Sequence, residues 1–140
     1  MKIYFAASIR GGRNDKELYL GIIQVLSKFG TVLTEHIGSQ DLTRLGETKD
    51  DTYIRLRDIE WITEGNIFVA EVTNPSLGVG YEIREAELQQ KSILCLYRQI
   101  EGQKVSAMIT GSNAVTLKEY QNIADVEDIV RQFIQRVKTA

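Results

Sequence analysis

Two carboxylates stand in this sequence where an acid is costly unless it is paired or used. The first is Asp58, in the expected helix 51–64, four residues after Ile54 and four before Ile62. At about 100° per residue, Asp58 falls between the two isoleucines on the helical wheel. A carboxylate in an apolar stripe is unfavourable without a partner or a function, and perturbed carboxylates concentrate at functional sites. Asp58 is therefore a candidate catalytic acid, and a buried ion pair with an arginine is the structural alternative.

The second acid is Glu82, which follows the segment PSLGVGY (75–81) in the first turn of the expected helix 78–90. Val79, Glu82 and Ala86 share one helix face by their spacing, so Glu82 should point toward the edge of a sheet. Its alternative is a favourable interaction with the helix dipole. Two inward acids suit glycosidic-bond cleavage, in which one carboxylate attacks the anomeric carbon while another group assists the leaving group.

Glycine-containing turns after two expected strands are candidate anion sites. The first is ASIRGGR, made of Ala7, Ser8, Ile9, Arg10, Gly11, Gly12 and Arg13. Glycines let backbone N–H groups approach an anion, a helix start adds its dipole, and the serine and arginines add donors. This segment predicts a phosphate cradle, although a turn that merely needs glycine would look the same. The second turn offers Ser76 as a helix N-cap, with Gly78 leaving the backbone open.

Tyr4 and His36 lie near the same predicted edge. A strand tyrosine is usually a core residue with a tethered hydroxyl. A lone histidine is more often structural than catalytic, and His36 has no cluster of partners that would indicate a metal.

The elements that must position these residues alternate between strands and helices. The strands are expected at 2–7, 31–34, 66–72, 92–97 and 114–118, and the helices at 14–29, 51–64, 78–90 and 125–138. Largely apolar strands between helices predict an α/β fold, with a doubly wound, five-stranded, mostly parallel sheet and helices on both faces. Ligands of such sheets bind beyond the carboxyl ends of the strands, where the segments above all begin.

Composition fits a single domain over residues 1–140. A net charge of −2 argues against a nucleic-acid-binding surface. The only cysteine, Cys95, excludes an internal disulfide and lies in an apolar run typical of a buried thiol. No targeting or membrane-spanning pattern is visible. The expectation is a cytoplasmic protein with no membrane partner, and a nuclear location stays open.

Six blocks occur in order up to Gly111: YFAASIRGGR (4–13), FGTVLTEH (29–36), RDIEW (57–61), AEVTNPSLGVGYE (70–82), ILCLYR (93–98) and SAMITG (106–111). They resemble the 2′-deoxynucleoside 5′-phosphate N-hydrolases, relatives of the nucleoside 2-deoxyribosyltransferases. The resemblance implies a flavodoxin-like (Rossmann-like) subunit that works as a homodimer. It also implies cleavage of the N-glycosidic bond of a deoxynucleoside monophosphate, with no metal or other cofactor.

The resemblance also assigns roles to residues of this chain. Glu82 matches the nucleophile that forms a covalent deoxyribosyl intermediate, Asp58 the acid that assists the leaving base, and Tyr4 the residue that orients the nucleophile. Residues 7–13, Gly78 and Ser76 match substrate contacts, chiefly to phosphate, and His36 matches a pocket residue. The loop that the other subunit contributes to the site corresponds in this chain to Ser106, Ala107 and Met108.

Other functions stay open at this stage. The transferase relatives tend to carry an acid at the position of Ser76, and a serine there favours a phosphorylated substrate. Ala7 departs from the glycine that close relatives often have. The enzymatic alternatives are a deoxyribosyltransferase and a ribonucleotide (CMP-type) N-glycosidase. The non-enzymatic alternative is a nucleotide-binding sensor module, and flavin binding rests on the fold alone.

Overall fold

The computed structural model describes residues 1–8, 15–34 and 50–140. Its single sheet has the strand order β2-β1-β3-β4-β5, and every strand pair is parallel. The strands are β1 (Lys2–Ala6), β2 (Thr31–Val32), β3 (Ile67–Glu71), β4 (Ser92–Tyr97) and β5 (Val115–Glu119). The helices are α1 (Lys16–Ser27), α2 (Asp51–Glu64), α3 (Leu77–Leu88), α4 (Ala107–Thr110) and α5 (Ile123–Thr139).

This strand order confirms the predicted flavodoxin-like α/β fold. The chain runs outward from β1 to β2, crosses back, and adds β3, β4 and β5 on the other side of β1. The order therefore reverses between β1 and β3, and ligands of open α/β sheets bind beyond the carboxyl ends of the strands at such a point. Tyr4, Glu71 and the start of α3 all lie on or beside these two strands.

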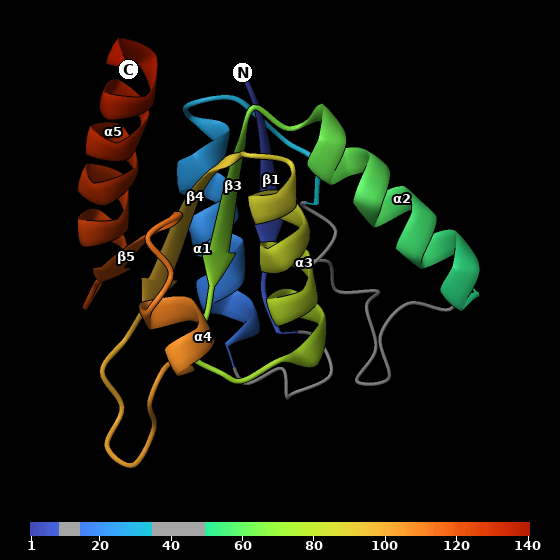
Figure 1. Cartoon of the computed structure of the whole chain (residues 1–140). Helices are drawn as coiled ribbons and strands as arrows, with labels where there is room; N and C mark the ends of the chain where they lie inside the picture. The colour runs from blue at the N-terminus through green and yellow to red at the C-terminus, as the bar shows by residue number, and fades with distance from the viewer. Residues whose placement is uncertain (9–14, 35–49) are drawn as a thin grey trace.

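Helices cover both faces of the sheet (Figure 1), and the sheet separates the hydrophobic core into two clusters. One face of β1 carries Ile3 and Phe5, which pack with side chains of α1 and α5. The other face carries Tyr4 and Ala6, which pack with α2 and α3. Both faces of the central strands are buried, which explains their continuous apolar sequence.

The predicted elements lie within a few residues of the observed ones, and the four-residue helix α4 was missed. It begins after Ser106, whose hydroxyl accepts a hydrogen bond from the backbone N–H of Met108 at 3.2 Å. Helix α5 begins two residues earlier than expected because Asn122 and Asp125 form a reciprocal capping box. No helix in the described ranges has the length and apolarity that crossing a bilayer would require.

Candidate active site

A tyrosine and a glutamate meet where β1 faces α3. The hydroxyl of Tyr4 donates a short hydrogen bond to the carboxylate of Glu82. Tyr4 is 1% exposed, and its ring stacks on Phe68 of the neighbouring strand with the ring centroids 5.2 Å apart. Because strand packing fixes the ring, its hydroxyl is held in one place and orients the glutamate.

Glu82 lies in the second turn of α3, not in the first turn as expected. The helix begins at Leu77, one residue early, because the hydroxyl of Ser76 caps it by accepting from the N–H of Val79 at 3.2 Å. A first-turn interaction with the helix dipole therefore does not explain this acid. The predicted inward face of α3 is confirmed, since Val79 and Ala86 are both buried against the sheet.

Asp58 forms the ion pair that the sequence left as an alternative. Arg57 donates to one oxygen of Asp58 from Nε at 3.1 Å and from a terminal nitrogen at 2.9 Å. The guanidinium also lies 4.8 Å from the ring centroid of Trp61. Of the predicted apolar stripe only Ile62 is buried, while Asp58 is half-buried with 25% of its side chain exposed. The pairing with Arg57 does not remove Asp58 from the acid site.

The two acids are close enough to influence each other's chemistry. Burial raises the pKa of Glu82 to about 7, and the charge of Asp58 adds to the rise, while Tyr4 and Arg57 oppose it. Burial also raises the pKa of Tyr4 strongly, with further contributions from Glu82 and Asp58, so the phenol stays protonated and donates. A carboxyl that titrates near neutral pH beside a second acid and a fixed donor can act as a nucleophile or as an acid–base group.

Asp58 lies in the middle of α2. Figure 1 shows α2 leaning away from the strands, with its first turns well to the side of the sheet. Every residue from Asp51 to Asp58 is exposed or half-buried. The charge of Asp58 nevertheless acts on the pKa values of Glu82 and Tyr4, which places this mid-helix residue near the carboxyl edge of β1.

The described ends of the predicted anion-binding segments lie at this same edge. Ser8, directly beyond β1, is 1% exposed, and its hydroxyl has no hydrogen-bond partner among the described residues. Ala7 is buried with its side chain in the α1–α5 core. A Cβ added to Gly78 would meet only the hydroxyl of Ser76, at 3.9 Å. The start of α3 is thus open to a ligand, while Ile9, Arg10, Gly11, Gly12, Arg13 and His36 lie outside the described residues.

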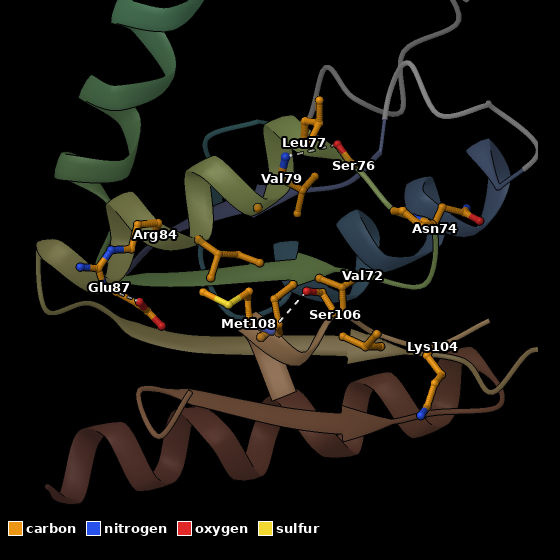
Figure 2. A pocket seen from close by; sticks show the side chains of 15 residues that line it. Val72, Asn74, Ser76, Leu77, Val79, Arg84, Glu87, Lys104, Ser106 and Met108 are labelled. Atoms are coloured by element: carbon orange, nitrogen blue, oxygen red, sulfur yellow. Dashed lines mark hydrogen bonds and ion pairs between the residues drawn. The ribbon is translucent and has the colours of Figure 1, made fainter. Parts of the chain in front are cut away.

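The segment around Ser106 lines a different place from the acids. A cleft of about 710 Å³ separates α3 from the 104–109 segment. Figure 2 shows Ser106 and Met108 facing Val79 across it. Tyr4, Asp58 and Glu82 are absent from its lining. Within one chain the structure therefore does not bring Ser106 or Met108 to the acid pair.

Sequence reasoning missed a polar network beside the site. At the end of β3, a carboxylate oxygen of Glu71 lies 3.7 Å from the Nε of Arg98, which follows β4. A terminal nitrogen of Arg98 lies 2.6 Å from a carboxylate oxygen of Asp15, and the side-chain amide of Asn74 donates to the same oxygen. The only sequence signal was that charged or amide side chains follow β3 and β4 directly.

The fold and the site together define a class of protein. It is a doubly wound α/β protein that gathers two carboxylates and an orienting tyrosine at the carboxyl edge of its sheet. This arrangement suits chemistry at a glycosidic carbon.

Comparison with known proteins then identifies the family. Residues 3–123 match the sequence model of the nucleoside 2-deoxyribosyltransferase family, and the chain belongs to that family. It is 46% identical over 138 residues to the 5-hydroxymethyl-dUMP N-hydrolase of Danio rerio, covering 96% of each chain. It is 43% identical over 143 residues to the protein of the same name from Tetraodon nigroviridis, covering 99% of this chain and 100% of the relative.

A solved structure supports the fold alone. The 2-deoxyribosyltransferase of Bacillus psychrosaccharolyticus superposes with a TM-score of 0.68 at 19% identity, covering 91% of this chain and 90% of that one.

Proposed function

We propose that this protein hydrolyses the N-glycosidic bond of 2′-deoxynucleoside 5′-monophosphates, releasing the free base and 2-deoxyribose 5-phosphate. The observation that carries the proposal is the placement of Glu82, which is oriented by Tyr4 and coupled to Asp58. The names of the relatives agree with it, since they describe N-hydrolases of a deoxynucleoside monophosphate.

In the first step, a carboxylate oxygen of Glu82 attacks C1′ of the deoxyribose. The bond from C1′ to the base nitrogen breaks, and its electron pair leaves with the base. In the reactive form of the site Glu82 is ionised and Asp58 carries the proton, which Asp58 supplies to the departing base. Covalent catalysis of this kind divides one difficult displacement into two easier ones.

In the second step, water attacks C1′ of the deoxyribosyl ester and restores the carboxylate of Glu82. Asp58, which has given up its proton, can then accept one from this water. A 2′-hydroxyl would withdraw electrons from the oxocarbenium-like transition state, so a deoxyribose reacts more readily. The residues that support phosphate recognition are Ser8, whose buried hydroxyl is unpartnered among the described residues, and Ser76.

The working unit is proposed to be a homodimer in which Ser106, Ala107 and Met108 complete the partner's site. In their own chain, Ser106 and Met108 line a cleft beside α3 whose lining does not include Glu82. Large apolar side chains are also exposed nearby, with Leu77 97% and Met108 86% exposed. Both side chains line the same cleft, and large exposed apolar side chains gathered in this way commonly mark an interface.

The direct test incubates the protein with 5-hydroxymethyl-dUMP and with dGMP and detects the free base by reversed-phase chromatography. Trapping a deoxyribosyl adduct by mass spectrometry and mapping it to the peptide that contains Glu82 tests the covalent step. Addition of free adenine to a deoxynucleoside distinguishes a transferase, and CMP distinguishes a ribonucleotide glycosidase. Tight binding of monophosphates with no base released, or unchanged release by Glu82→Ala, would refute the hydrolase.

A further inference from the structure

A fully buried carboxylate anchors the loop that follows β3. Glu71 is 1% exposed and accepts from the backbone N–H of Thr73 at 2.6 Å and from the hydroxyl of Thr73 at 3.0 Å. It also accepts a short hydrogen bond from Tyr120, beyond β5, and lies 3.7 Å from Arg98, beyond β4. A buried acid with several donors and a cation is well satisfied, so it holds the start of the loop rigidly.

The same arginine reaches from this anchor to the start of α1. A terminal nitrogen of Arg98 donates to a carboxylate oxygen of Asp15 at 2.6 Å, and the side-chain amide of Asn74 donates to the same oxygen at 2.8 Å. Asn74 also lies 3.3 Å from the hydroxyl of Tyr19. We name Asp15, Asn74 and Arg98 the clasp. It joins three segments that are distant in sequence, and Figure 2 shows Asn74 on the α1 side of the cleft.

Asp15 is the N-cap residue of α1, but its side chain does not cap the helix. It occupies the N-cap of α1, where an aspartate ordinarily accepts from a backbone N–H of the first turn, yet it makes no such side-chain bond. Its carboxylate is turned to Arg98, which offsets the negative charge. The first turn of α1 therefore has no side-chain cap from Asp15. Its one acid is the exposed Glu17, and an anion can interact with the backbone N–H groups of this turn.

The clasp also controls the start of α3. Asn74 is two residues before Ser76, whose hydroxyl accepts at the cap and still has its own hydrogen to donate. The loop between β3 and α3 is thus tied at Thr73 by the buried acid and at Asn74 by the clasp. The clasp fixes how far the start of α3 lies from the start of α1.

We propose that Asp15, Asn74 and Arg98 are positioning residues that set the affinity for the 5′-phosphate by fixing the starts of α1 and α3 relative to each other. The proposal rests on the proposed function, in which the substrate is a nucleotide. The clasp does not touch the reacting carbon. Its loss should therefore weaken the binding of phosphorylated ligands and spare the bond-breaking step.

The experiment compares Asp15→Ala, Asn74→Ala and their double variant with the wild type. Each single variant is expected to raise KM for a deoxynucleoside monophosphate about tenfold, the effect of losing one charged hydrogen bond, with a much smaller change in kcat. Turnover of the unphosphorylated deoxynucleoside should be unaffected. Because both side chains act through one carboxylate oxygen, the double variant should be no worse than Asp15→Ala.

Two further variants serve as controls. Lys28→Met removes the 3.0 Å ion pair with Glu127 at the opposite end of α1 and should leave KM unchanged. Arg98→Lys keeps the positive charge without the planar fork and should retain part of the affinity that Arg98→Met loses. Thermal unfolding checks that each variant is folded. If Asp15→Ala does not fold, Asn74→Ala carries the test.

The proposal would be overturned by an unchanged KM in both single variants, by a fall in kcat at constant KM, or by equal losses on nucleotide and nucleoside. A lower KM in Asp15→Ala would also overturn it, because Asp15 would then be restraining Arg98 from the substrate. If the wild type releases no base at all, the proposed function fails independently. Calorimetric titration with inorganic phosphate then decides, with weaker binding in both variants supporting the clasp and equal binding refuting it.

Discussion

Replacing Glu82 by glutamine should abolish turnover and make the protein more stable above pH 7. The carboxylate is the proposed nucleophile, and an amide cannot form the glycosyl ester. The amide can still accept the hydrogen bond from Tyr4, so the geometry of the site is retained. What the substitution removes is the cost of a negative charge that is largely shielded from water.

The size of that cost follows from the pKa of Glu82. Burial, with help from Asp58, raises it from 4.5 to about 7, which corresponds to roughly 3 kcal/mol. Between these pH values the folded protein holds a proton at Glu82 that the unfolded chain has released. The stability of the wild type therefore falls as pH rises through this window, and the full cost is present above pH 7.

Thermal unfolding at pH 5 and pH 8 measures this effect. The melting temperatures of the wild type and of Glu82→Gln should nearly coincide at pH 5. At pH 8 the variant should melt about 6–12 °C higher, at roughly 2–4 °C per kcal/mol for a chain of this size. Glu85→Gln, which neutralises a half-buried acid elsewhere on α3, should show no such gap. A gap that is the same at both pH values, or a variant that is less stable at pH 8, would refute the reasoning.

Three further predictions follow from the same geometry. Tyr4→Phe removes the hydrogen bond that lowers the pKa of Glu82, so the acidic limb of the pH–rate profile should move to higher pH. The value of kcat should also fall about tenfold or more, and an acidic limb that does not move would contradict this prediction. Ser76→Ala should lower the free energy of unfolding by about 1 kcal/mol, because the helix cap is lost, whereas Ser76→Asp should keep the cap but lower kcat/KM for nucleotides, because a carboxylate repels phosphate. Chemical unfolding measures the first effect and steady-state kinetics the second. Full nucleotide activity in Ser76→Asp would exclude a phosphate contact. Burial raises the pKa of Cys95 to about 12, so the thiol should not react with a disulfide reagent at pH 8 until denaturant is added, and rapid labelling of the native protein would show that β4 is more open than described.

Much of the fold could be predicted because its signals are local. Continuous apolar runs such as 92–97 indicate strands buried on both faces, and their alternation with helices predicts a parallel sheet. The short helix α4 was not predicted because a single turn is too short to show a hydrophobic period. It begins where the hydroxyl of Ser106 accepts a backbone hydrogen bond, and this cap can be identified only in the folded structure.

The residues of the candidate site were proposed from the sequence, but most of the contacts between them were not. Glu82 and Asp58 stood out because an acid on an inward helix face is unusual. The partner of Asp58 turned out to be its own neighbour Arg57, and side chains of adjacent helix residues ordinarily diverge. The clasp was invisible in the sequence because Arg98 and Asp15 are 83 residues apart.

The sequence by itself determined which segments emerge at the carboxyl edge of the sheet and which residue types they carry. It did so because strand and helix periodicity, glycine and N-cap preferences act over a few residues. The tertiary structure alone decided that the hydroxyl of Tyr4 meets Glu82, 78 residues away, and that burial brings the pKa of this acid close to neutral pH. Such contacts depend on how α2 and α3 pack over β1, and the loss of water around a side chain is a property of that packing.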